Sequence, residues 1–336
     1  MQRLLFIRDQ TMAKEHSMKL LRILILLCSL LFTGCGNMAE KPAGSGYTVQ
    51  DVRGKTVTLA KAPQKILTDS LHLDETLLCV VPAGYLSGVY YLDDEPGISF
   101  IAAETKPVQP KLRQVTPETV ASLHPDVFLA SQWSDPGLIQ KVEEMEIPVV
   151  VCYGPVTVQQ IQDNVKLMGK VVGKEKTGEA VAHQMDERLQ KIKGVLQQQP
   201  APKPVGLLVS LMSRYGGKGS LYDVLTQKAG FINGIAAAGL SNGALLTPEA
   251  VLKANPDFFL LSQPYGEEKA QYDPFVQQFL DTPALASLQG RRQVALPDRY
   301  VYDASPMVVY GIEAMANAAY GKILFPQGEE RILRGQ

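Results

Sequence analysis

The chain has 336 residues, which is enough for two domains of ordinary size, each with its own core. Hydrophobic residues make up 46% and charged residues 20%, a composition typical of a globular protein. The formal net charge of -1 gives no basic excess that would indicate nucleic-acid binding. The four cysteines at positions 28, 35, 79 and 152 lack the spacing of a zinc or redox site.

The N-terminal segment has the pattern of an export signal. Lys19 and Arg22 precede a mostly apolar run over residues 23–32, and small residues then lead to Cys35. The run is too short to cross a bilayer, which takes about 20 apolar residues. We therefore predict a signal peptide over residues 1–34, with Met18 as the true start.

Residues 31–35, Leu-Phe-Thr-Gly-Cys, resemble a lipoprotein signal, in which the cysteine is acylated and becomes the mature N-terminus. Phe32 stands where leucine is commonest in that pattern. The alternative is an ordinary secretory signal with an incidental cysteine. The small and polar residues that follow suit a flexible linker, so residues 35–46 are predicted to be a lipidated tether.

Beyond the tether, strands and helices are expected to alternate. Polar and apolar residues alternate over residues 47–59 around an Arg-Gly-Lys turn, which predicts a hairpin. A helical pattern covers residues 71–81, and two more cover 157–172 and 175–197 with Gly173 between them. Short apolar strands are expected at residues 65–67, 88–90, 126–130, 147–152, 205–211, 258–261 and 293–296.

Strands that alternate with helices indicate parallel βαβ units with helices on both faces of the sheet. The predicted fold class is α/β, with two Rossmann-like lobes with parallel central sheets joined by one long rigid helix. The expected boundaries are an N-terminal lobe over 47–156, linker helices over 157–200, and a C-terminal lobe over 201–336. Cys79 and Cys152 lie in apolar segments and are predicted to be buried free thiols rather than a disulfide.

An internal repeat supports the two similar lobes. Residues 116–131 align without a gap on residues 247–262, and nine of the sixteen positions are identical. Each copy begins with Thr-Pro-Glu, where threonine caps a helix, proline occupies its first turn, and glutamate suits the positive end of the dipole. A second proline then stops the helix, and an aspartate starts a buried strand.

The order of these segments resembles the substrate-binding proteins of ABC importers for siderophores, haem and vitamin B12. The resemblance covers nearly the whole mature chain. It is carried by the opening hairpin, the two Thr-Pro-Glu repeats, and the segments at residues 62–67, 220–225, 229–233, 305–306 and 311–313.

The resemblance implies a ligand that binds in the cleft between the lobes, and small hinge motion because the connecting helix is rigid. It implies an ABC permease with its ATPase subunits as the partner, and it matches Glu118 and Glu249 to the glutamates that meet arginines of the permease. The alternative is that each glutamate only suits the first turn of its helix. The protein is further expected to be an exported, membrane-anchored monomer with no intrinsic cofactor and no bound metal.

Residues in the loops after the strands are expected to line the cleft, because ligands bind at the carboxyl ends of parallel strands. The aromatic and cationic members of this set suit a large, flat, partly anionic ligand. The candidates are Ser70, His72, Tyr90, Tyr91, Gln132, Trp133, Tyr153, Met212, Arg214, Tyr215, Lys218, Tyr265, Arg299, Tyr300 and Tyr302.

Several of these candidates have a second interpretation. His72 either ligates haem iron or caps a helix. Tyr300 and Tyr302 alternate like a strand, so one of them is expected in the core. The glycine-rich segment around Lys218 is not a nucleotide-binding loop, because Gly219 follows the lysine where Ser or Thr is needed. It either holds an anionic group of the ligand or forms a flexible turn.

The ligand predicted from the sequence is a ferric siderophore or a corrinoid, with haem as the alternative within the same family. A bare metal-ion binder and an exported enzyme are weaker alternatives, and a surface adhesion module is a third. The mature chain has only three histidines, and none of the common hydrolase or metalloprotease motifs occurs in it.

Overall fold

The computed structural model describes residues 46–264, 266 and 269–335. The predicted signal peptide, the predicted lipidation site Cys35 and the candidate Tyr265 lie outside these residues, and their roles stay predictions. Residues from Gly46 onward form one compact unit.

The unit opens with the predicted hairpin, made by β1 (Tyr47–Gln50) and β2 (Thr56–Leu59) as an antiparallel pair. Asp51 closes its turn, because its Oδ1 accepts hydrogen bonds from the backbone N–H groups of Arg53 and Lys55 at 2.9 and 3.1 Å. An aspartate that bonds to backbone amides a few residues ahead is a common way to fix a tight turn.

The first parallel sheet has the strand order β3-β6-β7, from Ile66–Thr68, Val127–Ser131 and Val149–Cys152. All twelve of these strand residues are buried, as expected when helices cover both faces of a sheet. Associated helices are α2 (Leu71–Leu78), α3 (Ala102–Thr105), α4 (Pro117–Leu123) and α5 (Pro136–Glu144). A separate parallel pair joins β4 (Val89–Tyr90) to β5 (Lys111–Leu112).

The second parallel sheet has the order β11-β10-β8-β9, from Arg292–Pro297, Phe258–Gln263, Val205–Val209 and Ile232–Asn233. Its helices are α8 (Leu221–Lys228), α9 (Gly234–Ala237), α10 (Pro248–Ala254), α11 (Lys269–Leu280), α12 (Arg299–Tyr302) and α13 (Val308–Tyr320). The two parallel sheets confirm the predicted α/β fold class. We call the parts built on the first and second sheets the N-lobe and the C-lobe; the predicted lobe boundaries stay predictions.

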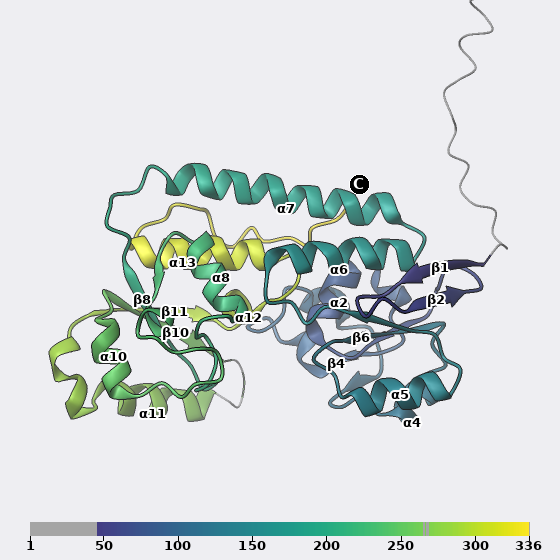
Figure 1. The fold of residues 1–336 in the computed structure, drawn as a ribbon, viewed down its shortest axis with the longest axis horizontal. Helices are drawn as coiled ribbons and strands as arrows, with labels where there is room; N and C mark the ends of the chain where they lie inside the picture. The colour runs from purple at the N-terminus through teal and green to yellow at the C-terminus, as the bar shows by residue number, and fades with distance from the viewer. Residues whose placement is uncertain (1–45, 265, 267–268, 336) are drawn as a thin grey trace, which may run out of the picture. The chain divides into compact units, whose positions relative to one another are not determined.

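Two helices lead from the first sheet to the second. The chain passes through α6 (Val158–Val171), turns at Gly173 with a positive φ of 69°, and continues as the 22-residue α7 (Glu175–Leu196). Helix α7 packs beside α6 and α13 and runs along one side of the unit (Figure 1). Arg188 of α7 fixes this arrangement, since its guanidinium binds both carboxylate oxygens of Glu313 in α13 at 2.8 and 2.7 Å.

The repeat forms the same helix–strand unit in both lobes. Thr116 and Thr247 cap α4 and α10, and their side chains accept hydrogen bonds from backbone N–H groups three residues on. His124 and Asn255 end the two helices in the left-handed conformation, with φ of 46° and 43°. The following strands are β6 and β10, so the predicted repeat of structure is confirmed.

Candidate ligand-binding cleft

A cavity of about 650 Å³ lies between the two lobes at the carboxyl ends of their parallel strands. Its walls come from the segments that follow β3, β6, β8, β10 and β11, which is where ligands bind in open α/β sheets. The structure brings six of the predicted residues to this cavity: Ser70, His72, Tyr90, Trp133, Met212 and Tyr302.

The most distinctive pair on the N-lobe side is His72 and Trp133. His72 lies in the first turn of α2, and its ring centroid is 5.1 Å from that of Trp133, with the two planes tilted by 56°. The histidine is only 8% exposed, whereas the indole is 59% exposed. The indole lies directly on Gly154, where a Cβ atom would come within 2.4 Å of Trp133 Cδ1. Glycine at 154 is therefore required for this packing.

His72 is held as a neutral imidazole. Burial lowers its pKa from 6.5 to about 4, and a hydrogen bond to the backbone of Tyr153 only partly opposes that effect. Its Nε2 atom is buried and has no hydrogen-bond partner among the described residues. Because Nε2 is unpaired, the bond to Tyr153 uses Nδ1. The side chain thus presents an unused nitrogen lone pair at the cleft, an arrangement that suits metal ligation.

The loop that carries Trp133 is held in place by hydrogen bonds to Asp69 and Ser131. The carboxylate of Asp69 accepts hydrogen bonds from Ser131 N at 3.2 Å and from the hydroxyl of Ser134. The backbone N–H of Trp133 in turn donates to Ser131 Oγ at 3.1 Å. These bonds fix the backbone beneath an exposed aromatic ring, which is how a binding surface is preorganised.

The C-lobe side of the cleft is more apolar and more exposed. Leu211 and Met212 are 38% and 53% exposed, although large hydrophobic side chains are usually buried. Beside them the hydroxyl of Tyr302 is hydrogen-bonded to Ser210 Oγ, and its ring packs 5.3 Å from that of Tyr215. Exposed apolar groups gathered in one concave site indicate a ligand-binding surface.

Four carboxyl groups line the cleft, and the sequence did not single them out. They belong to Asp69 and Glu75 on the N-lobe side, and to Asp298 and Asp303 on the C-lobe side. Glu75 and Asp303 are hydrogen-bonded to each other, and burial together with the neighbouring carboxylate raises the pKa of Glu75 well above its usual range. Glu75 appeared only as part of a helical run, and no sequence signal separated it from a solvated acid.

The remaining described candidates lie outside this lining. The guanidinium of Arg214 donates to Gly243 O at 3.0 Å, and that of Arg299 donates to Pro96 O at 3.0 Å. Tyr215 is packed behind the cleft wall against Tyr222. The others are Tyr91, which packs edge-on against Tyr90, and Gln132, Tyr153, Lys218 and Tyr300.

The strand-like alternation of Tyr300 and Tyr302 does not correspond to a strand. Both tyrosines lie in the short helix α12, so they do not alternate between two faces of a sheet. The expectation that one of them is in the core is confirmed, since Tyr300 is 7% exposed while Tyr302 lines the cleft. Two residues of spacing fit the start of a helix as well as a strand, and packing decided between them.

Glu118 and Glu249 are both exposed, at equivalent positions in the first turns of α4 and α10. Their pKa values are lowered by hydrogen bonds at the helix N-termini, so both side chains are anionic at neutral pH. Helices α4 and α10 lie toward the side of the unit opposite to α7 (Figure 1).

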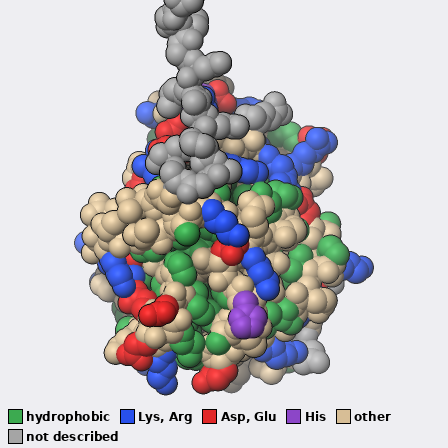
Figure 2. All heavy atoms as spheres, turned by 90° about the vertical axis from the view of Figure 1, so that its right-hand side faces the viewer, with side chains coloured by type: hydrophobic (Ala, Val, Ile, Leu, Met, Phe, Trp, Pro, Cys, Tyr) green, Lys and Arg blue, Asp and Glu red, His purple; other side chains and the backbone are tan. Residues whose placement is uncertain are grey.

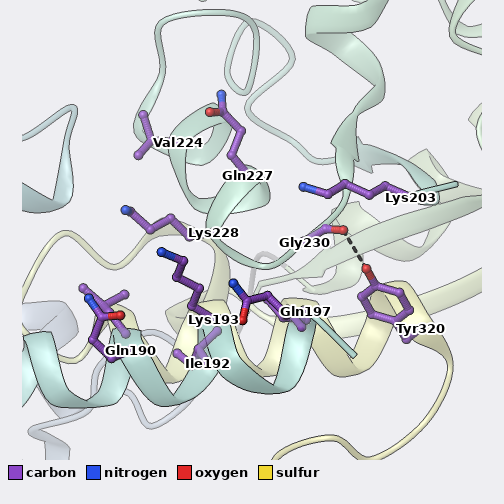
Figure 3. Close-up of a pocket in the computed structure, with 12 residues that line it drawn as sticks. Gln190, Ile192, Lys193, Gln197, Lys203, Val224, Gln227, Lys228, Gly230 and Tyr320 are labelled. Atoms are coloured by element: carbon purple, nitrogen blue, oxygen red, sulfur yellow. Dashed lines mark hydrogen bonds between the residues drawn. The ribbon is translucent and has the colours of Figure 1, made fainter. Parts of the chain in front are cut away.

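A second cavity, of about 530 Å³, lies between α7 and α8 (Figure 3). Lys193, Lys203 and Lys228 surround it together with three glutamines, and Tyr320 donates a hydrogen bond to Gly230 O at its edge. It contains none of the predicted ligand residues and does not lie at the carboxyl ends of the strands. The cleft between the lobes is therefore the better candidate.

Other surface features add less. On the side shown in Figure 2, acidic and basic side chains are interspersed rather than gathered into one patch. Within the described ranges, no helix is both long and apolar enough to cross a membrane. In the same part of the chain, no group of three or more His, Cys, Asp or Glu side chains is placed to hold a metal ion. Cys79 and Cys152 are buried free thiols, as predicted.

Comparison with known protein families gives one match. Residues 64–294 match the periplasmic binding protein family. No curated protein sequence matches the chain.

Solved structures with the same fold include three proteins from different organisms. The periplasmic heme-binding protein RhuT from Roseiflexus sp. RS-1, in its apo form, is 22% identical, with 77% of this chain and 98% of that chain covered and a TM-score of 0.65. A periplasmic heme-binding protein from Pseudomonas aeruginosa is 19% identical, with 78% and 94% covered and a TM-score of 0.62. A periplasmic solute-binding protein from Veillonella parvula DSM 2008 is 18% identical, with 86% and 89% covered and a TM-score of 0.64.

Proposed function

Because this chain belongs to the periplasmic binding protein family, we propose that it captures a metal chelate in the cleft between its lobes and delivers it to the permease of an ABC importer. The family is one of solute-binding proteins, and the fold is shared with solute-binding and heme-binding members. The ligand classes proposed are corrinoids and ferric siderophores, with haem as a second candidate.

The observation that carries this proposal is the unpaired Nε2 of His72. A buried polar atom without a partner costs free energy, typically about 1–3 kcal/mol, so its persistence calls for a function. A neutral imidazole fixed through its other nitrogen is a good ligand for iron or cobalt. This favours a chelate whose metal keeps an axial position open, as in corrinoids and haem, over one whose ligands fill every position.

Trp133 fits the same role. Its exposed indole covers the imidazole and offers a flat aromatic surface of the kind that stacks on a large planar ligand. Nε2 is buried in this structure, so ligation requires the groups packed around the imidazole, the neighbouring indole among them, to move aside. The mobile thioether of Met212 on the opposite wall can adapt to the outline of a bound chelate.

Haem is kept as the second candidate because two of the proteins with the same fold are named as heme-binding. His72 would supply one axial ligand there. Tyr302 lines the opposite wall with a phenolic oxygen, a group that also ligates haem iron in some proteins.

Delivery to the permease is proposed to use Glu118 and Glu249. Two exposed anions at equivalent positions on the two lobes suit a pair of basic sites on a membrane partner. Export and acylation of Cys35 would hold the protein at the membrane beside that partner. Export as a lipoprotein fits ligand capture better than it fits an enzyme or an adhesion module, and a bare-ion site is the weakest alternative.

Titration of the purified mature protein with cobinamide, cobalamin, haemin and several ferric siderophores tests the proposal. Trp133 is the only tryptophan in the chain, so its fluorescence reports on the cleft directly. We expect saturable quenching by one class at micromolar or tighter affinity, after inner-filter correction. His72→Leu should weaken binding of a ligated chelate by about tenfold or more and change its absorption spectrum.

A control variant outside the cleft, Glu179→Gln on the exposed face of α7, should leave binding unchanged. If no chelate binds by fluorescence or by calorimetry, the proposed function is wrong.

A further inference from the structure

The lining of the cleft is acidic, although the sequence predicted a partly anionic ligand for it. Four carboxyl groups line it, and the described residues of its lining include no lysine or arginine. Two predicted cations are engaged away from it, since Arg214 binds the carbonyl of Gly243 and Arg299 binds that of Pro96. Arg299 also lies over the ring of Phe100, 5.1 Å from its centroid, and so serves to join the two lobes.

The acids come from both walls and are fixed in place. Glu75 is 1% exposed and accepts a hydrogen bond from Phe100 N at 2.8 Å. Asp303 is 7% exposed and accepts one from Ser305 N at 2.8 Å, and it faces Glu75 across the floor of the cleft. Two buried carboxyl groups in contact share one proton, because two full negative charges this close repel strongly.

Two features show that these groups form a binding site rather than only a cluster of acids. Asp303 Oδ2 is buried and accepts no hydrogen bond from a backbone N–H or a hydroxyl group among the described residues, and the only side-chain partner of this carboxyl besides Ser305 is the carboxyl of Glu75. His72 Nε2 is likewise buried and unpaired on the opposite wall of the same cavity. A ligand group that donates a hydrogen bond or carries positive charge would pair with the Asp303 carboxylate, and a metal would pair with His72 Nε2.

We infer that the cleft selects metal chelates whose periphery carries amide, hydroxyl or cationic groups, and that it discriminates against chelates that carry carboxylates. Asp298 and Asp303 determine this selectivity from the C-lobe wall. The inference rests on the proposed function and narrows its ligand class. A ligand carboxylate buried here would meet like charges without a basic partner, whereas an amide or ammonium group would find acceptors.

Pairs of chelates that share a core and differ in their peripheral groups, chiefly in charge, test this inference. Cobinamide is compared with cobyric acid, which exposes one carboxylate on the same ring. Haemin is compared with its dimethyl ester, and ferrioxamine B is compared with its succinylated form. Dissociation constants are measured by calorimetry with the mature protein at neutral pH and low ionic strength. For each core that binds, the member without the extra carboxylate should bind at least about tenfold more tightly.

Variants then assign the selectivity to residues. Asp303→Asn keeps an oxygen for Ser305 N, and Asp298→Asn keeps one for the hydroxyl of Ser262. Each should reduce the preference within a pair by about threefold or more, mainly by improving binding of the carboxylated member. Glu179→Gln removes an equal charge from α7 and should leave the preference unchanged.

The outcomes separate the inference from the proposed function. If a core binds but its two members bind equally, or the carboxylated member binds better, the charge inference is overturned and the proposed function stands. If none of the six chelates binds, the proposed function falls and takes the inference with it. If preference persists in both variants, the selectivity does not come from these aspartates.

Discussion

In both lobes a threonine-capped helix leads into a strand that has a buried serine near its carboxyl end. In both lobes this serine donates a hydrogen bond to an aspartate. Ser131 of β6 donates its backbone N–H to Asp69, and Ser262 of β10 donates its hydroxyl to Asp298. Both aspartates line the cleft from the end of a neighbouring strand. The frame of the binding site is therefore the same on the two sides.

The walls built on that frame differ. Beyond Ser131 the N-lobe presents Trp133 over a buried histidine, on a loop held by several hydrogen bonds. Beyond Ser262 the C-lobe presents Pro264, and Met212 and Leu211 lie exposed beside it. The comparison teaches that the repeated residues fix where the strands end at the cleft. The residues that follow them differ between the lobes, and these residues define which ligand fits.

The largest expected effect comes from reversing both exposed glutamates. In the double variant Glu118→Arg and Glu249→Arg, transport of the ligand should fall by about a hundredfold or more, because like charges would face each other at the permease. Ligand affinity of the purified protein should not change, since neither side chain lines the cleft. Uptake in cells and calorimetry on the same variant give the two measurements. Normal uptake by the double variant would sink the docking role.

A second prediction concerns His72 and acid stability. Burial lowers the pKa of His72 from its ordinary value of 6.5 to about 4 in the folded protein, so the unfolded chain binds more protons between these two values. Its contribution to the free energy of unfolding therefore falls by about 3 kcal/mol as pH falls from 6.5 to 4. The raised pKa values of Asp74 and Asp303, each about 6, act in the opposite direction, because the folded state there binds more protons.

Two aspartates act against one histidine over comparable pKa shifts, so the wild-type protein should gain stability on acidification over this range. His72→Leu removes the histidine contribution and leaves that of the acids, so the variant should become more stable on acidification relative to wild type. Urea unfolding followed by circular dichroism at several pH values measures the difference. Parallel pH profiles for the two proteins would show that His72 is not held neutral by burial.

A third, smaller effect is expected at Gly154, on which the indole of Trp133 packs. The methyl group of Gly154→Ala would lie 2.4 Å from the indole of Trp133 and must displace it. The cost should be about 1–2 kcal/mol of unfolding free energy, because the indole is exposed and can move. Trp133 fluorescence and its quenching by iodide should both change.

Gly194→Ala is the matched control, since a Cβ at that position on α7 meets no atom within 4 Å. It should leave the fluorescence unaltered and stabilise the helix slightly. Unchanged emission in Gly154→Ala would contradict the packing described for Trp133.

The smallest effect tests whether the repeated helix–strand unit contributes equally to stability in the two lobes. Thr116→Ala and Thr247→Ala each remove a helix cap and should each lower the unfolding free energy by about 1 kcal/mol. Ligand affinity should stay the same in both. A clear inequality between the two variants, measured by thermal unfolding, would show that the lobes do not share their local energetics.

Much of the frame could be predicted from the sequence. Threonine and proline signals placed the helix starts and stops of the repeat, and the apolar runs placed most strands within a few residues. Where bounds differ, a local cause is visible: β8 ends at Val209 rather than at 211, so that Leu211 and Met212 enter the cleft loop. The hydrophobic pattern of the sequence cannot distinguish the end of a strand from an apolar loop that lines a binding site.

The sequence by itself determined the two parallel sheets, the repeated helix–strand unit, and the loops that reach the cleft, because these depend on local propensity and hydrophobic pattern. Only the tertiary structure decided which loop residues face one another. It turned Arg214 and Arg299 away from the cleft and brought Glu75 from one lobe against Asp303 from the other, 228 residues apart. The physical reason is that burial and pairing of a charge are properties of its surroundings, which distant segments supply and no local pattern records.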